Sequence, residues 1–263
     1  MFVRLAIIIL AALSLPVRAQ VDSLRLDGDY LRNYWTDTRD LVTAPARWQG
    51  KDWLKLAAMA GTTAALTAID QPVRDFALQH QSRTLSDLSK YGLEPLGDEY
   101  LFSIMAGFLA HGAIARNSKS QATALLAAES YIISGIMVRI SKYMTGRVRP
   151  DAWWEPGPGA WKGPGQGQSF FSGHTTAAFA VASVIACQYR ETRWVPVTAY
   201  TLATLAGLSR VYDNRHWMSD IFAGAVFGTA TGLFLCRQNL DRQFSCHPSL
   251  QPGFSGMQIT YRW

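Results

Sequence analysis

Six apolar stretches, separated by short polar segments, dominate the pattern of this chain. They contain 13 to 18 residues each and lie at Trp53–Ile69, Leu101–Ala115, Thr123–Ile140, Thr175–Cys187, Trp194–Leu208 and Ile221–Cys236. These lengths are at or below the ~17–25 residues of a membrane-spanning helix. The last three stretches contain no charged residue, whereas a helix that faces water on one side carries a polar stripe. The pattern therefore predicts an all-α fold, a bundle of about six helices that is largely embedded in a membrane.

The composition adds a modest positive charge and a hydropathy that is low for a membrane protein. The 263 residues are 49% apolar and include 25 Lys and Arg against 19 Asp and Glu, a net charge of +6. The mean hydropathy of +0.02 leaves a buried soluble bundle open as an alternative. The cations form neither a basic stripe nor a pattern with interleaved aromatics, so we expect no nucleic-acid partner. A negatively charged substrate or a membrane surface fits this excess better.

The segments outside the apolar stretches divide the remaining chain into three parts. Residues 1–19 join an early Arg to an apolar run and the small-residue pattern Val17-Arg18-Ala19, which predicts a signal peptide or an uncleaved signal anchor. Residues 20–52 form a polar and aromatic arm with short helices, and residues 53–236 form the helical domain. Residues 237–263 form a tail that we expect to contain a short strand or extended chain, because it is too short for a membrane barrel.

The three cysteines show no spacing typical of a metal or redox site. Cys187 lies inside an apolar stretch, and we interpret it as a small buried hydrophobic residue. A disulfide between Cys236 and Cys246 is an alternative if both face an oxidising compartment. No Asp/Glu cluster or His/Cys spacing suggests a metal site, so we predict neither a metal nor a cofactor.

The first polar motif places Lys142 seven positions before Arg149, which Pro150 follows. Seven positions are two helical turns, so both cations can face one site. Pro150 disfavours a helical conformation at Arg149, which places this residue in extended chain at a helix end. A guanidinium fork and a mobile ammonium group suit the oxygens of a phosphate. The alternative is that both cations complement the dipole of a helix C-terminus.

The second motif, Ser172-Gly173-His174, follows a loop rich in Gly, Pro and Trp and begins the fourth apolar stretch. Ser is a favoured helix N-cap, Gly lets a ligand approach the backbone, and free amides at a helix N-terminus bind anions. His174 would lie in the first turn, where it can protonate a leaving-group oxygen. The alternative is an ordinary N-cap followed by a polar residue.

The third motif consists of Arg210, His216 and Asp220, just before the last apolar stretch. His216 and Asp220 are four positions apart and lie on one face of a helix. Asp220 can accept the ring N–H of His216, which fixes the tautomer and makes the other ring nitrogen a better nucleophile. The alternative is a helical ion pair worth ~0.3–0.5 kcal/mol. Three cations and a helix N-terminus together can stabilise the charge of a phosphoryl group in transfer.

In this order, the three motifs resemble the signature of the type-2 phosphatidic acid phosphatase superfamily, which joins lipid phosphate phosphatases, bacterial acid phosphatases and vanadium haloperoxidases. The resemblance covers roughly Thr123 to Cys236. It implies that His216 is a nucleophile that becomes a phosphohistidine, oriented by Asp220, and that His174 protonates the leaving group and then activates water. It also implies a phosphate-binding set of Lys142, Arg149, Ser172, Gly173 and Arg210. Phe171 replaces the usual Pro before Ser-Gly-His, which loosens that loop but removes no chemical group.

The resemblance implies a phosphatase that hydrolyses a phosphomonoester or pyrophosphate. The uncharged helices favour a membrane lipid as the substrate that bears this phosphate. A soluble periplasmic acid phosphatase of broad specificity, which would act on small phosphoesters, is the main alternative. Halide oxidation on bound vanadate is another alternative, and a helical scaffold without enzymatic activity is a third. No residue pattern identifies a protein partner.

Lys and Arg residues on the short connections opposite the motifs indicate the orientation in the membrane. They are Arg116, Lys119, Arg190, Arg193, Arg237 and Arg242. The positive-inside rule then places the chain in the inner membrane of a bacterial envelope, with the site facing the periplasm. A crossing by Trp53–Ile69 after a cleaved signal would reverse this orientation. Because Lys55 and a Thr pair make that stretch a weak span, we expect it not to cross.

Overall fold

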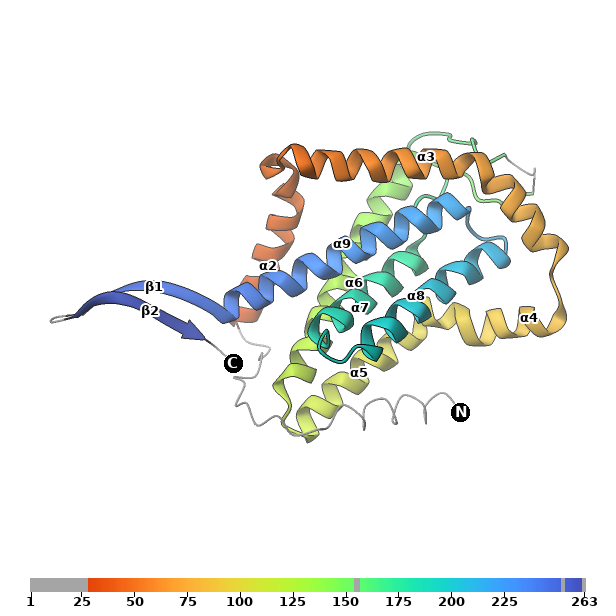
Figure 1. Cartoon of the computed structure of the whole chain (residues 1–263). Coiled ribbons are helices and arrows are strands. Elements are labelled where there is room, and N and C mark those ends of the chain that lie inside the picture. Colours follow the sequence, from red (N-terminus) through yellow and green to blue (C-terminus); the bar gives the residue numbers. More distant parts are fainter. Residues whose placement is uncertain (1–27, 154–156, 252–253, 262–263) are drawn as a thin grey trace.

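The computed structural model describes residues 28–153, 157–251 and 254–261, so the expected signal segment 1–19 lies outside it. The described chain forms a helical body with a C-terminal hairpin (Figure 1). Every predicted helix is present. Their bounds are α3 (Gly50–Gln79), α5 (Glu99–Ile114), α6 (Ser118–Thr145), α7 (Gly173–Gln188), α8 (Trp194–Tyr212) and α9 (Met218–Gln243). The prediction of an all-α bundle of about six helices is therefore confirmed.

Helix α7 is central to the bundle and packs against α6, α8 and α9. Glycines on α9 allow its backbone to touch that of α7. A Cβ atom at Gly228 would lie 2.3 Å from the carbonyl oxygen of Thr176, and one at Gly232 would lie 2.3 Å from that of Ala180. Since a Cβ cannot occupy such a position, both glycines are required for the close packing of α7 on α9.

A disulfide joins the ends of α7 and α9 that lie away from the polar motifs. Cys187 and Cys236 are bonded, with their Cα atoms 6.5 Å apart. Both interpretations of the cysteines from the sequence are therefore wrong, because Cys187 is not a free buried residue and Cys236 does not pair with Cys246. The bonded residues are 49 positions apart, and only the packing of two helices that run in the same direction brings them together.

Helix α3 extends beyond the apolar stretch that predicts it. It begins after a capping box between Gln49 and Asp52 and continues past Ile69, through Pro72, to Gln79. The part before residue 70 is largely exposed in the structure, whereas Asp70 is only 1% exposed. Helix α3 packs against α9 and α8, and it thereby brings a buried carboxylate to the start of α9.

The remaining elements connect and flank the bundle. The expected arm contains α2 (Gly28–Thr43) and a 3₁₀ turn (Ala44–Arg47), so a 16-residue helix replaces the short helices expected there. Helix α4 (Arg83–Leu88), a π-helical turn (Ser89–Leu93) and a 3₁₀ turn (Glu94–Gly97) lead into α5. The tail forms an antiparallel pair, β1 (Phe244–Gln251) and β2 (Phe254–Tyr261), where one short strand is expected.

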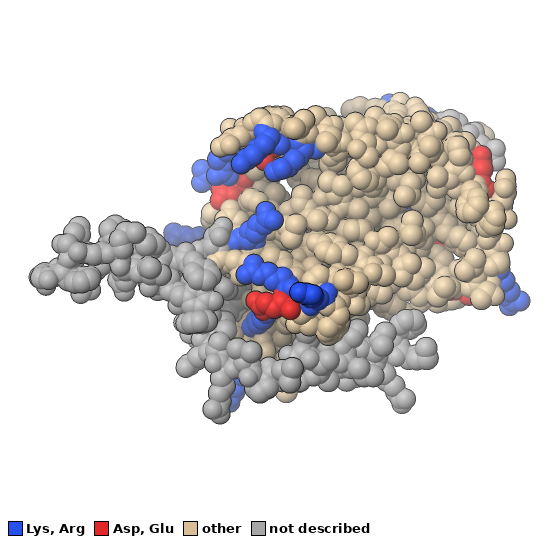
Figure 2. Space-filling model, in the orientation of Figure 1, with Lys and Arg blue, Asp and Glu red and all other residues tan. Residues whose placement is uncertain are grey.

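Two of the described helices are long and apolar enough to cross a membrane. These are α6 and the part of α9 from Met218 to Leu240. Helix α3 is not among the described helices that meet this criterion. Figure 2 shows that the middle of one face of the molecule carries almost no charged side chain, whereas Lys and Arg gather toward the end near α2 and the hairpin.

Candidate active site

His216 and Asp220 lie together where α9 begins, with the histidine in the preceding turn. The Nδ1 atom of His216 is 3.5 Å from Oδ2 of Asp220, and both side chains are buried. The backbone N–H of Trp217 donates to the same carboxylate oxygen at 3.1 Å. Because Nδ1 faces the carboxylate, Nε2 is the ring nitrogen that remains for a substrate. The i,i+4 spacing in the sequence thus corresponds to a buried contact and not to a surface ion pair.

A second carboxylate and a guanidinium lie directly behind this pair, and neither is among the residues predicted from the motifs. Arg147 is fully buried and binds Asp220 through Nη1 and Asp70 through Nη2, the latter at 2.7 Å. Ser219 accepts from Arg147 Nη1 at 2.7 Å, and Ser169 donates to Oδ2 of Asp220. The Asp220 carboxylate is therefore held by two side chains from distant parts of the chain, Arg147 and Ser169, and by the neighbouring backbone N–H of Trp217.

The sequence contains weak signals for these additional residues. Arg147 lies two positions before Arg149, in the Gly-Arg-Val-Arg-Pro segment that supplies the first motif. Asp70 directly follows the apolar stretch Trp53–Ile69, and the acidic residue before it in the sequence is Asp52. A lone carboxylate at the end of such a stretch indicates a buried partner, since an unpaired buried charge is costly. The sequence does not show that Arg147 is this partner.

Lys142 and the start of α7 face one another. A Cβ atom built on Gly173 would lie 3.8 Å from Nζ of Lys142, so the ammonium group lies beside the first turn of α7. Ser172 is the N-cap of this helix, and its Oγ accepts from the backbone N–H of Thr175 at 3.4 Å and from its hydroxyl at 2.9 Å. The Ser172 hydroxyl therefore organises the helix N-terminus in this structure, as the alternative for that motif expects.

The two remaining cations have different surroundings. Arg210 is buried and pairs with Glu94 at 2.6 Å, with Asp213 at a longer 3.8 Å. Arg149 is half-buried and donates from Nε to the carbonyl oxygen of Gln168 at 3.4 Å. A phosphate that binds Arg210 would thus compete with Glu94, whereas Arg149 has no carboxylate partner among the ion pairs of the described residues.

His174 lies in the first turn of α7 and contacts the turn before α5. Its Nε2 atom is 4.0 Å from Oδ2 of Asp98, and about a third of its side chain is exposed. Gly97 lies against it so closely that a Cβ there would be 2.8 Å from the Cβ of His174. The 3₁₀ turn that ends at Gly97 therefore positions the His174 side chain from behind.

We expect Gly97→Ala to lower turnover about tenfold, because the added methyl group displaces His174 from its position. Steady-state kinetics of the purified variant would measure the effect. Gly135→Ala is the matched control, since a Cβ at Gly135 has no atom within 4 Å. Equal activity of Gly97→Ala and Gly135→Ala would contradict the close positioning of His174.

Burial affects the protonation of the His216 ring. It lowers the pKa of His216 to about 4, against the opposing effect of the Asp220 carboxylate. The pKa in the unfolded chain is near 6.5, so between these two values the unfolded chain binds more protons. The free energy of unfolding therefore falls as the pH drops from 6.5 to 4, by up to ~3 kcal/mol from this residue.

The variant His216→Gln tests this effect, because it lacks the titrating ring. We expect thermal unfolding of the wild-type chain to lose more stability than the variant between pH 7 and pH 4.5. A difference in Tm that stays constant over this range would show that the pKa of His216 is not lowered.

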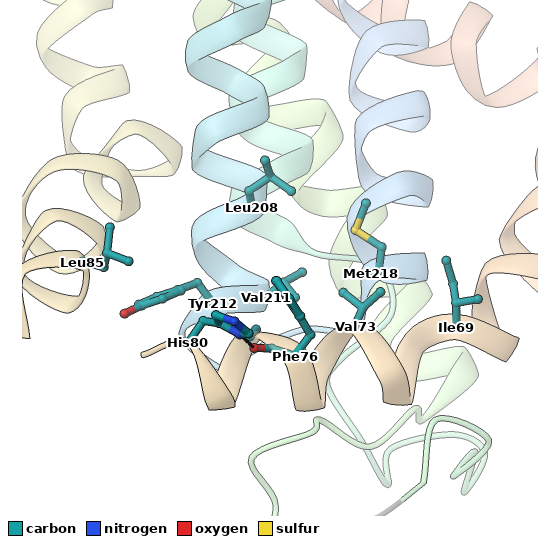
Figure 3. Close-up of a pocket in the computed structure, with 10 residues that line it drawn as sticks. Ile69, Val73, Phe76, His80, Leu85, Leu208, Val211, Tyr212 and Met218 are labelled. Carbon is teal, nitrogen blue, oxygen red and sulfur yellow. Dashed lines mark hydrogen bonds between the residues drawn. The ribbon is translucent and has the colours of Figure 1, made fainter. Parts of the chain in front are cut away.

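An apolar cavity lies between α3, α8 and α9. It has a volume of about 420 Å³ and is formed by α3, α4, α8 and α9. Figure 3 shows its lining, with Val73 and Phe76 on α3 opposite Leu208 and Met218. None of the eight predicted site residues is among the residues that line it.

Comparison with known proteins agrees with the motifs. Residues 123–244 match the family model described as PAP2 superfamily. A lipid A 1-phosphatase of Porphyromonas gingivalis is 40% identical over 101 residues, which are 38% of this chain and 20% of that protein. A lipid A 1-phosphatase of Rhizobium etli is 27% identical over 202 residues, 70% of this chain and 82% of that protein. The first alignment thus spans only a fifth of the relative's own length.

A solved structure has the same fold. It is the crystal structure of a transmembrane PAP2 type phosphatidylglycerolphosphate phosphatase from Bacillus subtilis, with a TM-score of 0.52 at 20% identity. The match covers 71% of this chain and 96% of that one. The resemblance predicted from the three motifs is confirmed, and the matched residues 123–244 include all eight predicted site residues. Asp70 lies outside the matched range.

Proposed function

We propose that this chain, whose residues 123–244 match the PAP2 superfamily model, is a metal-independent phosphatase. It hydrolyses a phosphomonoester or pyrophosphate, most naturally of a membrane lipid, through a phosphohistidine intermediate. The observation that carries this proposal is the buried His216–Asp220 pair, with Nδ1 3.5 Å from the carboxylate. A neutral imidazole with one nitrogen turned to a carboxylate has its second nitrogen available for attack on phosphorus.

The reaction has two steps that use the same residues. In the first, Nε2 of His216 attacks the phosphorus atom, the bond to the leaving oxygen breaks, and His174 donates a proton to that oxygen. In the second, His174 removes a proton from water, the water oxygen attacks phosphorus, and the bond from phosphorus to Nε2 of His216 breaks, which releases phosphate and restores the free imidazole. Lys142, Arg149 and Arg210 neutralise the charge of the phosphoryl oxygens in both steps.

The preference for a lipid rests on the surface and on the relatives. Helices α6 and α9 are each long enough to cross a membrane, and the uncharged face in Figure 2 suits contact with lipid tails. Two of the relatives are named lipid A 1-phosphatases. The Lys and Arg residues on the opposite connections support the proposed placement in the inner membrane of a bacterial envelope, with the site toward the periplasm.

Phosphate release by the detergent-purified protein tests the proposal. The substrates are a 1-phosphorylated lipid A, polyprenyl pyrophosphate and p-nitrophenyl phosphate, each with a chelator present. Faster release from a lipid than from the soluble ester supports a lipid phosphatase. Equal or faster release from the soluble ester would support a broad acid phosphatase instead, and no release from any of the three would refute a phosphatase.

A further inference from the structure

Asp70 has a different environment from the other aspartates of α3. Asp52 and Asp75 are partly exposed, with 29% and 48% of their side chains accessible, whereas Asp70 has none accessible. Its Oδ1 accepts the backbone N–H of Ser219 at 2.8 Å, and its Oδ2 accepts the hydroxyl of Ser219 and Nη2 of Arg147. The hydrogen bonds of Asp70 in the structure therefore go to Arg147, which also binds Asp220, and to Ser219, which immediately precedes Asp220.

These contacts transmit the position of Asp70 to the His216 ring. Ser219 immediately precedes Asp220, so the bond from its backbone N–H fixes the first turn of α9 at that point. Arg147 binds the Oδ1 atom of Asp220, which leaves Oδ2 for Nδ1 of His216. Through Arg147, Asp70 thus contributes to fixing which oxygen of Asp220 faces the imidazole, together with Ser169 and the backbone N–H of Trp217 on Oδ2.

The charges of the cluster lead to the same conclusion. Arg147, Asp70 and Asp220 have no side-chain exposure. A guanidinium paired with Asp220 alone would neutralise the carboxylate that His216 needs. A second carboxylate shares the guanidinium, so the cluster keeps one negative charge beside a ring that becomes cationic when it is phosphorylated.

We propose that Asp70 is a positioning residue of this site, which acts on His216 through Arg147, Ser219 and Asp220. The inference rests on the proposed phosphatase function and extends the site to α3, which lies outside the matched residues 123–244. The segment before the family core therefore supplies part of the machinery that orients the nucleophile.

The variant Asp70→Asn tests the proposal, with Asp75→Asn on the same helix as its control. Asp75 is paired only at the surface, with Arg74 at 3.8 Å and Gln71 at 2.9 Å. The assay measures kcat and KM on the lipid phosphate that the wild-type chain hydrolyses best. The thermal unfolding curve of each variant gives its folded fraction at the assay temperature. For Asp70→Asn we expect kcat per folded molecule to fall by about tenfold or more, with KM within about twofold.

The division between kcat and KM separates positioning from a purely structural role. If Asp70 only docks α3, the loss appears in the folded fraction, and kcat per folded molecule equals that of the wild type and of Asp75→Asn. This result would overturn the proposal. Failure of the wild-type chain to release phosphate from any substrate would instead remove the proposed function, so the two failures are distinguishable.

Ser219→Ala provides a second variant in case Asp70→Asn does not fold. It removes the hydroxyl that donates to Asp70 and accepts from Arg147 at 2.7 Å, and it leaves no buried charge unpaired. We expect a folded protein whose kcat is about threefold lower at unchanged KM. A kcat equal to that of the wild type would overturn the proposal whatever the behaviour of Asp70→Asn.

Discussion

His216→Ala is expected to release phosphate at least about 10⁴-fold more slowly than the wild-type chain, because the variant lacks the atom that bonds to phosphorus. Lys142, Arg149 and Arg210 remain in this variant, so binding of inorganic phosphate should change little. Turnover of the preferred lipid phosphate measures the loss of activity. Binding of inorganic phosphate to the purified variant measures the affinity that it retains. This combination separates the nucleophile from the residues that hold the substrate.

The matched control is His80→Ala, at the far end of α3. His80 is exposed and stacks on Phe76, with ring centroids 4.1 Å apart. Its removal should leave turnover unchanged. A rapid-quench experiment with ³²P-labelled substrate should trap an acid-labile phosphoenzyme in the wild type and in His80→Ala, but not in His216→Ala. Wild-type turnover by His216→Ala would contradict the mechanism.

Arg147→Met is expected to have the largest effect on stability. The substitution leaves two carboxylates, Asp70 and Asp220, buried next to each other without a cation. Removing one partner of a buried ion pair costs about 3–5 kcal/mol, which for a chain of this size corresponds to a fall in Tm of roughly 10 °C. Thermal unfolding in detergent measures the fall, and turnover should be lost with it because Asp220 is no longer held toward His216.

Arg215→Met serves as the control for the loss of an ion pair at the same end of the bundle. Arg215 binds Asp151 at 2.8 Å, but half of its side chain is exposed. A surface pair of this kind contributes about 0–1 kcal/mol, so its Tm should stay within a few degrees of the wild type. Similar Tm values for the Arg147 and Arg215 variants would show that the buried cluster is not a major source of stability.

The sequence predicts the helices well because their signal is local. Apolar stretches of 13 to 16 residues without charges identify the last three helices directly. The pattern is less informative about where each helix ends. Helix α3 tolerates Pro72 and continues to Gln79, because its later residues pack on α8 and α9. The Cys187–Cys236 disulfide depends on packing between α7 and α9, which no local pattern encodes.

The candidate site likewise has residues that the sequence predicts and a residue that it does not. Lys142, His174, His216 and their neighbours are found from the sequence because each belongs to a short motif with helical spacing. Asp70 is 149 positions from Ser219, its hydrogen-bond partner, so its role depends on tertiary structure alone. The residues proposed to contact the phosphate thus lie in motifs, whereas Asp70, proposed to support them from another helix, does not.

The glycines of α9 also have a consequence for the timing of the reaction. His174 begins α7 and His216 directly precedes α9, and the backbones of these helices touch at Gly228 and Gly232. The packing of these two helices, together with the turn at Gly97, therefore fixes the distance between the proposed proton donor and the proposed nucleophile. In the proposed mechanism no closing motion is needed to bring these two groups together, so we expect the arrival and departure of the lipid to limit the rate of turnover.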